Sequence, residues 1–237
     1  MSDNQTPMRT IGLIGGMSWE SSAHYYRILN EEVAQRLGGL HSADVILHSL
    51  DFAPIEAMQR ADDWQAAGER LAASARGLIA AGAEVIGLAT NTMHIVADRL
   101  TDAIDAEFIH IAEPTADALL ADGFTRVALL GTRFTLEKPF YRERLAGRGL
   151  EVLVPEVDVT NLNGIIYEEL CRGIVTEGSR QRYVTAIELL AARGAQAVIL
   201  GCTEINMLID DPVSPLPVYD TTELHAKALV EAALTGR

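Results

Sequence analysis

The sequence predicts an α/β protein of two similar domains, each a mostly parallel sheet with helices on both faces. Two observations support this fold class. Short apolar segments alternate with helix-length segments along all 237 residues, which is the pattern of βαβ units. Four apolar segments also end in a short polar or glycine turn, at Gly15, Thr90, Gly131 and Gly201. This weak internal repeat predicts two related halves whose strand ends share one ligand cleft.

The first half opens with a strand and a glycine turn. The strand is expected at residues 10–14 and ends at Gly15-Gly16, and Met17-Ser18 precedes a helix expected at 22–37. Small residues let the backbone approach a ligand, and the free N–H groups of a helix start favour a carboxylate or a phosphate. The turn is therefore either a ligand loop or a plain connection. It lacks the G-x-G-x-x-G spacing of a dinucleotide site.

The rest of the first half follows the same rhythm. Residues 51–63 are polar and contain Pro54, which predicts an irregular segment that either lines a pocket or crosses the surface. Thr90, Asn91 or Thr92 is expected to be the N-cap of a further helix. Strands are predicted at 44–50 and 84–89, and an alanine-rich helix at 66–81.

The alternation starts again after Pro114. Strands are predicted at 126–130, 151–154 and 197–200, helices at 115–122, 140–148, 165–174 and 180–193, and a turn at 131–135. The last helix, expected at 222–234, is predicted to pack back onto the first half. The predicted domains are therefore residues 1–106 plus 213–237, and residues 107–212.

Composition and charge exclude several classes of function. The formal net charge of −14 and the pI near 4.8 argue against nucleic-acid binding and against attachment to anionic membranes. Cys171 and Cys202 form no C-x-x-C pair and join no His/Cys cluster, so neither a zinc site nor a disulfide framework is predicted. No segment approaches 18 apolar residues, and residues 1–9 lack the apolar core of a signal peptide. A cytoplasmic protein is expected.

Chemistry is expected at two of the strand ends. Gly201 is followed by Cys202, Thr203 and Glu204, which carry a thiol, a hydroxyl and a carboxylate. A lone cysteine after a buried strand is more often a core residue than a nucleophile. A helix start at this point would let backbone N–H groups lower the pKa of the thiol, and a thiolate can act as a nucleophile or a base. The equivalent residue at the earlier strand end is Thr90, for which an N-cap is the ordinary interpretation.

Together these motifs resemble the aspartate/glutamate racemase family over essentially the whole chain. The resemblance is carried, in the order that the family has them, by residues 11–22 with Tyr25-Tyr26 and Asn30, by Asn91-Thr92-Met93-His94, by Leu130-Gly131-Thr132 with Phe134-Thr135, and by Gly201-Cys202-Thr203-Glu204. Residues 41–52 and Asp220-Thr221 are most similar to the branch of broad-specificity amino-acid racemases.

The resemblance implies an isomerase without a cofactor, whose active site lies in the cleft between two pseudo-two-fold related domains. In this family one sulfur removes the α-proton of an amino acid and a second sulfur returns a proton to the opposite face. The expected partner is a small amino-acid substrate, and the family tends to form homodimers. The resemblance assigns substrate binding to Met17, Ser18, Gln59, Asn91, Thr92, Thr132, Thr203 and Glu204, and it implies no metal.

The chain departs from the family at the first acid/base position, where the usual Cys-Asn-Thr is Thr90-Asn91-Thr92. Cys202 is then the only thiol in a matching position, because Cys171 falls inside a predicted helix. A threonine hydroxyl is a far poorer base than a thiolate, although it can deliver or relay a proton. In the family the second sulfur acts on the L-enantiomer. The expected catalytic pair is therefore Cys202 and Thr90, with faster racemisation from L-substrates than from D-substrates.

Two further positions bear on the substrate. Glu204 stands where glutamate racemases usually have a histidine, which disfavours a role in making cell-wall D-glutamate. Gln59 matches a position at which the aspartate-specific branch tends to use arginine, and a neutral amide there is compatible with more than one amino acid. The resemblance gives no role to Arg133, Lys138, Arg172, His94 or His225.

Two alternatives stay open at this point. A decarboxylase of the arylmalonate type needs only one cysteine, which protonates an enolate after carbon dioxide leaves. A protein that lost the first thiol is alternatively an amino-acid-binding module without turnover. The first would release carbon dioxide, and the second would bind a ligand tightly without exchanging its α-hydrogen for solvent.

Overall fold

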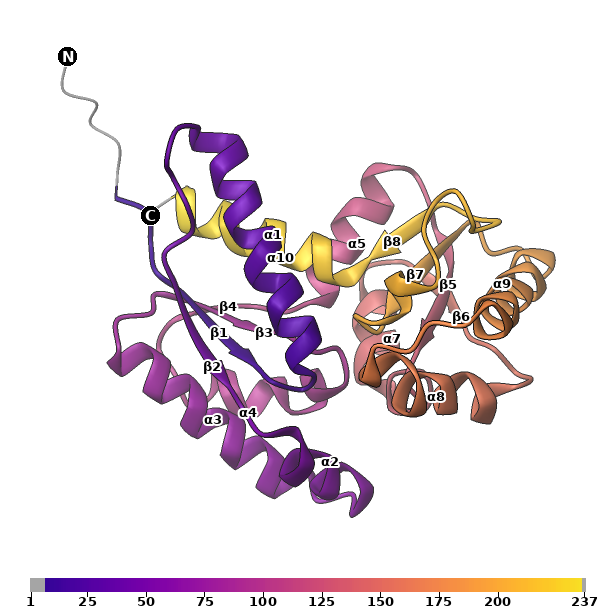
Figure 1. Ribbon diagram of the computed structural model, residues 1–237, viewed down its shortest axis with the longest axis horizontal. Helices are drawn as coiled ribbons and strands as arrows, with labels where there is room; N and C mark the ends of the chain where they lie inside the picture. Colours follow the sequence, from indigo (N-terminus) through magenta and orange to yellow (C-terminus); the bar gives the residue numbers. More distant parts are fainter. Residues whose placement is uncertain (1–6, 236–237) are drawn as a thin grey trace. The chain divides into compact units, whose positions relative to one another are not determined.

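The computed structural model describes residues 7–235 and divides into two compact units. Unit 1 consists of the residues up to Ala89, of Val96–His110 and of the residues from His225 onward, whereas unit 2 consists of Thr90–Ile95 and Ile111–Leu224. The chain therefore passes from one unit to the other four times (Figure 1). Residues 1–6, which belong to the segment judged not to be a signal peptide, lie outside the described residues.

Unit 1 is built on a four-stranded parallel sheet in the order β2-β1-β3-β4. The strands are β1 (Ile11–Gly15), β2 (Val45–Ser49), β3 (Val85–Leu88) and β4 (Glu107–Ile109). Tyr25 and Leu29 of α1 (Trp19–Leu37) share a core with Leu229 and Val230 of α10 (Thr221–Leu234) on one face of the sheet. The other face is covered by α3 (Trp64–Ala80), against which α4 (Ala97–Thr101) packs (Figure 1).

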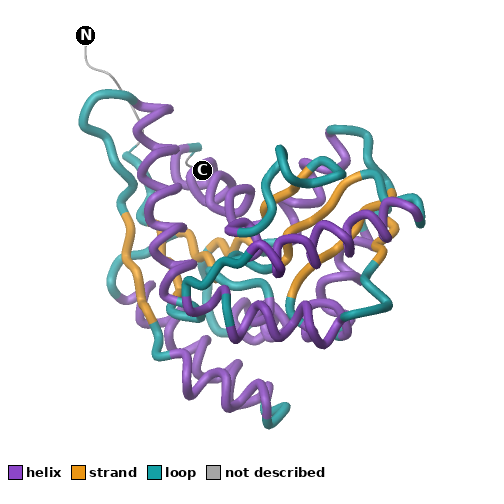
Figure 2. Tube along the Cα trace, turned by 45° about the vertical axis from the view of Figure 1, so that its right-hand side comes forward, coloured by secondary structure: helices purple, strands orange, loops and turns teal. Residues whose placement is uncertain are grey.

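Unit 2 has a second four-stranded parallel sheet, in the order β6-β5-β7-β8. The strands are β5 (Arg126–Gly131), β6 (Glu151–Leu153), β7 (Ala197–Gly201) and β8 (Val218–Asp220). Successive residues of β5 and β7 face opposite sides, as strand geometry requires. Leu129 and Ile199 face α5 (Ala112–Ala121) and α7 (Pro139–Gly147), whereas Leu130 and Leu200 face α8 (Val159–Glu168) and α9 (Glu177–Ala192). Figure 2 shows helices on both sides of the strands.

The two sheets have the same strand order, with each strand of unit 1 matched by the one four strands later. The expected fold class, two parallel sheets flanked by helices, is confirmed. β3 and β7 hold the same place in their sheets, so Thr90 and Cys202 follow equivalent strands. The prediction that the last helix packs onto the first half is also confirmed, because most of α10 belongs to unit 1.

The prediction that residues 51–63 form an irregular segment is wrong. These residues contain the helix α2 (Phe52–Arg60), which Asp51 caps by accepting a hydrogen bond from the N–H of Ala53. Pro54 lies in the first turn of this helix, where the backbone N–H has no partner within the helix and its absence costs nothing. The proline therefore marks a helix start rather than a loop.

Several short elements differ from the predictions. Thr92 begins a 3₁₀ helix, η1 (Thr92–Val96), and the α-helical part starts only at Ala97. The turn expected at residues 131–135 contains the start of the single-turn helix α6 (Arg133–Glu137), for which Thr132 is the N-cap. The helix expected at 165–174 is instead α8 followed by the 3₁₀ helix η2 (Leu170–Arg172), and η3 (Ile205–Met207) follows β7.

The strands β4 and β8 were not predicted, and both bear on how the chain is divided. β4 pairs with β3, which places residues 107–110 in unit 1, and β8 pairs with β7, which places residues 213–224 in unit 2. The contacts thus divide the chain at 110 and 224, where the predicted domains divide at 106 and 212. None of the helices within residues 7–235 is long and apolar enough to cross a bilayer.

Candidate functional site

Three polar residues follow neighbouring strands at one edge of the unit 2 sheet. β5 and β7 end at the paired residues Gly131 and Gly201, so the next residues, Thr132 and Cys202, leave the sheet side by side. β8 pairs with β7 so that Thr221 lies level with Gly201 at the same edge. Ligands of parallel α/β sheets bind beyond the carboxyl ends of the strands. This edge is therefore the candidate site of unit 2.

The end of β7 requires glycine. A Cβ atom on Gly201 would lie 2.7 Å from the carbonyl oxygen of Leu130 and 2.8 Å from Cδ1 of Leu129. Both distances are shorter than van der Waals contact, so a larger residue would push β5 and β7 apart. Glycine thus keeps the two strand ends close at the point where Cys202 begins the turn.

Glu204 accepts hydrogen bonds from the side chains of the two preceding residues of this turn. The thiol of Cys202 donates a hydrogen bond to Oε2 of Glu204 at 3.1 Å, and the hydroxyl of Thr203 donates to the same oxygen at 2.7 Å. All three side chains are buried. A buried carboxylate requires hydrogen-bond donors around its oxygens, and these two groups supply them. The geometry directs the thiol proton at an atom that can accept it.

Burial raises the pKa of the Cys202 thiol well above its ordinary value, and the Glu204 carboxylate raises this pKa further. The backbone N–H of Glu204 lowers it, but by less. The expected lowering of the thiol pKa by a helix start is therefore wrong. Only the three-residue η3 follows the turn, and its few N–H groups do not outweigh the desolvation of a thiolate.

The second cysteine lies close to this turn. Cys171 of η2 packs against the core cluster that contains Cys202, and burial, together with the Glu204 carboxylate, raises the pKa of Cys171 to about 12. The sequence placed Cys171 away from the matching position, and it gave no sign of this proximity. A thiol with so high a pKa stays protonated at neutral pH unless a neighbouring group takes its proton, and no hydrogen bond from the Cys171 thiol to a carboxylate is seen among the described residues.

The turn that begins at Thr90 is bound to the β5 end of unit 2. Oγ1 of Thr92 lies 2.9 Å from Oγ1 of Thr132, which lies 3.2 Å from Oγ1 of Thr135. The side chains of these three threonines and of Thr90 are buried. The structure thus brings the predicted residues Thr90, Thr92 and Thr132 together within one unit, although Thr90 follows a strand of the other unit.

Asn91 is fixed by a residue to which the prediction gave no role. Its Nδ2 atom donates to Oγ1 of Thr221 at 2.9 Å, and the Thr221 hydroxyl donates to the carbonyl of Leu200 at 2.8 Å. Because the hydroxyl has one proton and donates it to the carbonyl of Leu200, its oxygen must accept a hydrogen bond from the Asn91 amide. This fixes the orientation of the Asn91 side chain. Oδ1 of Asn91 is buried and has no partner among the described residues. The sequence signals for Thr221 were its place at a helix start and its part, with Asp220, in the family resemblance.

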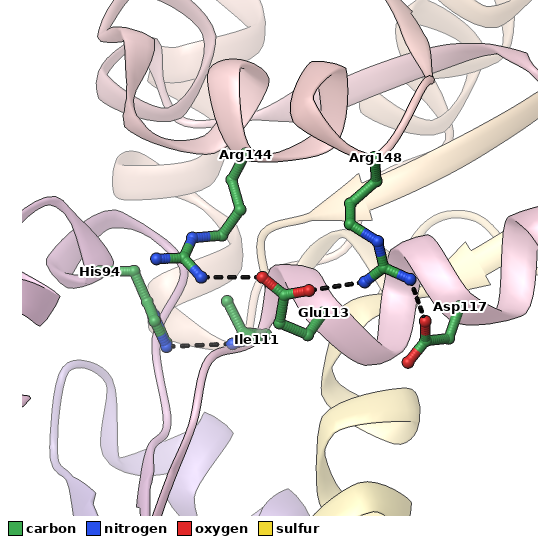
Figure 3. Close-up of polar contacts among 6 residues, drawn as sticks. All are labelled: His94, Ile111, Glu113, Asp117, Arg144 and Arg148. Atoms are coloured by element: carbon green, nitrogen blue, oxygen red, sulfur yellow. Dashed lines mark hydrogen bonds and ion pairs between the residues drawn. The ribbon is translucent and has the colours of Figure 1, made fainter.

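His94 also has a role that the sequence did not show. Its Nδ1 atom lies 2.7 Å from the carbonyl oxygen of Thr90, and Nε2 accepts from the backbone N–H of Ile111 at 3.2 Å (Figure 3). The ring is therefore neither a surface group nor a packing residue alone. It connects the Thr90 turn to the start of α5.

Three predicted substrate residues belong to unit 1. Ser18 caps α1 by accepting from the N–H of Ser21, and Met17 precedes it in a buried turn. Gly16 has φ = +90°, and a Cβ atom there would lie 2.1 Å from the carbonyl oxygen of Leu50, so this turn requires glycine. Gln59, near the end of α2, is 3% exposed.

The structure also locates three of the residues that were left without a role. Arg133 is exposed and pairs with Glu137 at 3.6 Å, and Lys138 precedes α7. His225 bonds the hydroxyl of Tyr25 and the carbonyl of Ile109 within unit 1. Among residues 7–235, no three histidine, cysteine, aspartate or glutamate side chains are grouped as metal ligands.

The sequence is similar to known racemases over most of its length. A family model described as Asp/Glu/hydantoin racemase matches residues 14–229. The broad-specificity amino-acid racemase RacX of Bacillus subtilis is 25% identical over 153 residues, which is 65% of this chain and 66% of RacX. The chain thus matches just under two thirds of the length of that relative.

Solved structures are similar over nearly the full chain. The crystal structure of a candidate Asp/Glu racemase from Yersinia pestis is 49% identical, with a TM-score of 0.89, over 96% of this chain and 100% of that one. An aspartate racemase homologue from Pyrococcus horikoshii is 32% identical, with a TM-score of 0.83, over 95% of this chain and 99% of that one. A glutamate racemase from Francisella tularensis, at 18% identity and a TM-score of 0.67, is similar in fold alone.

Proposed function

Because the chain belongs to the Asp/Glu/hydantoin racemase family, we propose that it racemises aspartate, glutamate or related small polar amino acids without a cofactor, and faster from the L-enantiomer. Racemases are isomerases, and this family works without a cofactor. The observation that carries the proposal is the buried Cys202 thiol, whose proton is directed at the Glu204 carboxylate.

The chemistry requires a strong base and a stabilised carbanion. The α-proton of an amino acid is very weakly acidic, so the reaction needs a strong base, and a thiolate in water-poor surroundings meets this need. We propose that the Cys202 thiol gives its proton to Oε2 of Glu204 and that the resulting thiolate removes the α-proton of the L-substrate. The raised pKa of the thiol makes it a strong base once it is ionised, since basicity rises with pKa.

Thr90 is the proposed acid on the opposite face of the substrate. Its hydroxyl delivers a proton to the carbanion and regains one by relay from water, and Glu204 releases to water the proton that it took from Cys202. The equivalence of the strands that precede Thr90 and Cys202 supports this pairing. In the reverse direction Thr90 would have to act as the base, and a hydroxyl is far weaker than a thiolate in that role. This asymmetry is the reason to expect slower turnover of D-substrates.

The remaining predicted residues are proposed to bind the substrate. Hydroxyl and amide donors of Asn91, Thr92, Thr132 and Thr203 would hold the carboxylate on which the carbanion charge develops. Preorganised donors serve this purpose best, and Thr92 and Thr132 are held by each other at 2.9 Å. Met17, Ser18 and Gln59 are the proposed contacts from unit 1. The neutral amide of Gln59 supports a broad choice of side chain.

Isotope exchange in heavy water tests the proposal. L- and D-aspartate, L- and D-glutamate and L-homoserine are incubated with the protein, and α-deuterium is followed by NMR and the enantiomers by chiral chromatography. We expect exchange and inversion of at least one amino acid, faster from the L-form, and loss of both in Cys202→Ser. Equal rates from the two enantiomers would contradict the preference for L-substrates.

The two alternatives give different results in the same assay. A binding protein would be stabilised by an amino acid in thermal melts without exchanging the α-hydrogen, and Cys202→Ser would leave that binding unchanged. A one-thiol decarboxylase would release carbon dioxide from an arylmalonate and leave amino acids untouched. Either result would replace the racemase proposal.

A further inference from the structure

The contacts of His94 fix which of its nitrogens carries the proton. A backbone N–H can only donate, so the Nε2 atom that faces Ile111 is an unprotonated acceptor. A carbonyl can only accept, so the Nδ1 atom that faces Thr90 carries the proton. The buried ring is therefore neutral. It holds the Thr90 backbone with its single proton.

The other end of this connection is firmly held. Ile111 precedes α5, whose first-turn residue Glu113 pairs with Arg144 at 2.7 Å and with Arg148 at 2.6 Å, and Arg148 also pairs with Asp117 (Figure 3). Each exposed pair contributes little to stability. A carboxylate shared by Arg144 of α7 and by Arg148, the C-cap of that helix, nevertheless orients the first turn of α5, and the turn before His94 is bonded to that point.

We infer that His94 is a positioning residue for the proposed reaction, because it sets the backbone of Thr90 and hence the direction in which the Thr90 hydroxyl delivers its proton. The inference rests on the racemase function proposed above. Three further bonds of this turn come from the side chains of Thr92 and Asn91 and from the backbone N–H of His94, which donates to the carbonyl of Asn91. These three do not involve the carbonyl of Thr90.

Loss of the His94 contact should affect the two halves of the reaction unequally. Cys202 would still remove the α-proton of an L-amino acid and return one from solvent, which labels the substrate without inverting it. Inversion needs the Thr90 hydroxyl in place on the opposite face. The ratio of α-hydrogen exchange in recovered L-substrate to formation of D-product therefore reports on the position of Thr90, and a general loss of structure would lower both rates together.

Two variants each keep one of the two contacts. The amide of asparagine lies near the position of histidine Nδ1 and that of glutamine near Nε2, so His94→Asn retains the bond to Thr90 and His94→Gln retains the bond to Ile111. His94→Phe removes both. His225→Gln is the matched control, because His225 is equally buried and bonds the carbonyl of Ile109 in unit 1.

The first measurement is the exchange-to-inversion ratio with L-aspartate and L-glutamate in heavy water. We expect the wild-type ratio for His94→Asn and His225→Gln, and a ratio at least about tenfold higher for His94→Gln and His94→Phe. Melting curves by circular dichroism verify that each variant is folded. Wild-type ratios for His94→Gln and His94→Phe, or a raised ratio for His94→Asn alone, would overturn the inference.

The second measurement does not depend on turnover. Imidazole ¹⁵N NMR should place the proton of His94 on Nδ1, and amide hydrogen exchange in residues 90–95 should be at least about tenfold faster in His94→Gln than in His94→Asn. Equal exchange in the two variants overturns the inference even if the protein racemises. The expected exchange pattern without turnover of any amino acid would support the contact and contradict the proposed function instead.

Discussion

Cys202 and Glu204 are joined by a hydrogen bond of 3.1 Å from the thiol to the carboxylate, in a turn where both side chains are buried. Two consequences follow from this one contact. The carboxylate is placed to take the thiol proton, and its negative charge raises the pKa of the thiol. A single substitution can separate these two effects.

We expect Glu204→Gln to slow the enzyme while making the thiol more acidic. The amide cannot take the thiol proton, so kcat for the L-substrate should fall about 100-fold, the size of a lost general base. Removal of the charge should lower the pKa of Cys202. This pKa is measured from the pH dependence of iodoacetamide alkylation in a Cys171→Ser background, which leaves one thiol. The exposed Glu137→Gln is the control. If the pH midpoint of alkylation rises in Glu204→Gln, the Glu204 charge does not raise the pKa of Cys202.

Thr90→Cys should make the reaction more symmetric. A second thiol supplies a competent base for the D-substrate, and we expect kcat for that enantiomer to rise at least about tenfold. Thr90→Ser keeps a hydroxyl and should keep the preference for the L-substrate. The measurement is the pair of initial rates from each enantiomer. If the ratio of these rates is the same in the wild type and in Thr90→Cys, Thr90 is not the second acid/base group.

Thr221→Val should weaken substrate binding through Asn91. Valine has the shape of threonine without the hydroxyl, so Asn91 and the carbonyl of Leu200 each lose a hydrogen bond. The free energy of unfolding should fall by about 1–3 kcal/mol, and KM should rise more than kcat falls. Thr221→Ser retains the hydroxyl and should behave like the wild type. Unchanged KM in Thr221→Val would show that the orientation of Asn91 does not matter for binding.

Two glycines should respond oppositely to alanine. A Cβ atom at Gly201 would approach Leu130 and Leu129 within 2.8 Å, so Gly201→Ala should cost about 1–3 kcal/mol of unfolding free energy. Gly147, in α7, has no atom within 4 Å of the added Cβ, and alanine should stabilise the helix there by about 0.5 kcal/mol. Urea unfolding of both variants measures the difference. Equal stabilities would mean that the strand end adapts without cost.

His225 should make the stability of the protein fall in mild acid. Burial lowers its pKa to about 4, from an ordinary value of 6.5. Between these pH values the unfolded chain therefore binds more protons than the folded protein does. The contribution of neutral His225 to the unfolding free energy is complete above about pH 6.5 and is lost as pH falls toward 4. The loss by pH 5 is about 2 kcal/mol. Urea unfolding measures the decrease in unfolding free energy between pH 7.5 and pH 5, and this decrease should be smaller by this amount in His225→Gln than in the wild type. An equal decrease in the two proteins would contradict the role given to His225.

The sequence predicted the long elements well because their apolar segments are buried on both faces. β1, β3, β5 and β7 begin and end within one or two residues of the predicted limits. β4 and β8 were missed because three residues are too few to show a periodicity, whereas the equally short β6 was predicted from its place after a helix in the alternation of elements. Pro54 was misinterpreted because proline marks both loops and first turns of helices, and only the tertiary structure distinguishes them.

The meeting of Thr132 and Cys202 at one sheet edge was predictable, but the contacts of the predicted site residues were not. Strand alternation alone indicates that Thr132 and Cys202 meet at one sheet edge. The direction of the Cys202 pKa shift was not predictable, because desolvation depends on residues brought in by α8 and α9. The role of His94 depends on Ile111, 17 residues later, and no local pattern reports such a contact.

The core of unit 1 combines the first helix with residues such as Ala226, Leu229 and Val230, whereas every residue of unit 2 precedes His225. A chain that ends at residue 224 can therefore complete the core of unit 2 but not that of unit 1. In such a chain the apolar face around Tyr25 stays uncovered, because α10 is incomplete. Purified protein truncated after residue 224 should show rapid proteolysis near Tyr25 and slow proteolysis in unit 2. The half of the chain that is made first thus depends for its core on a helix that is made after all of unit 2.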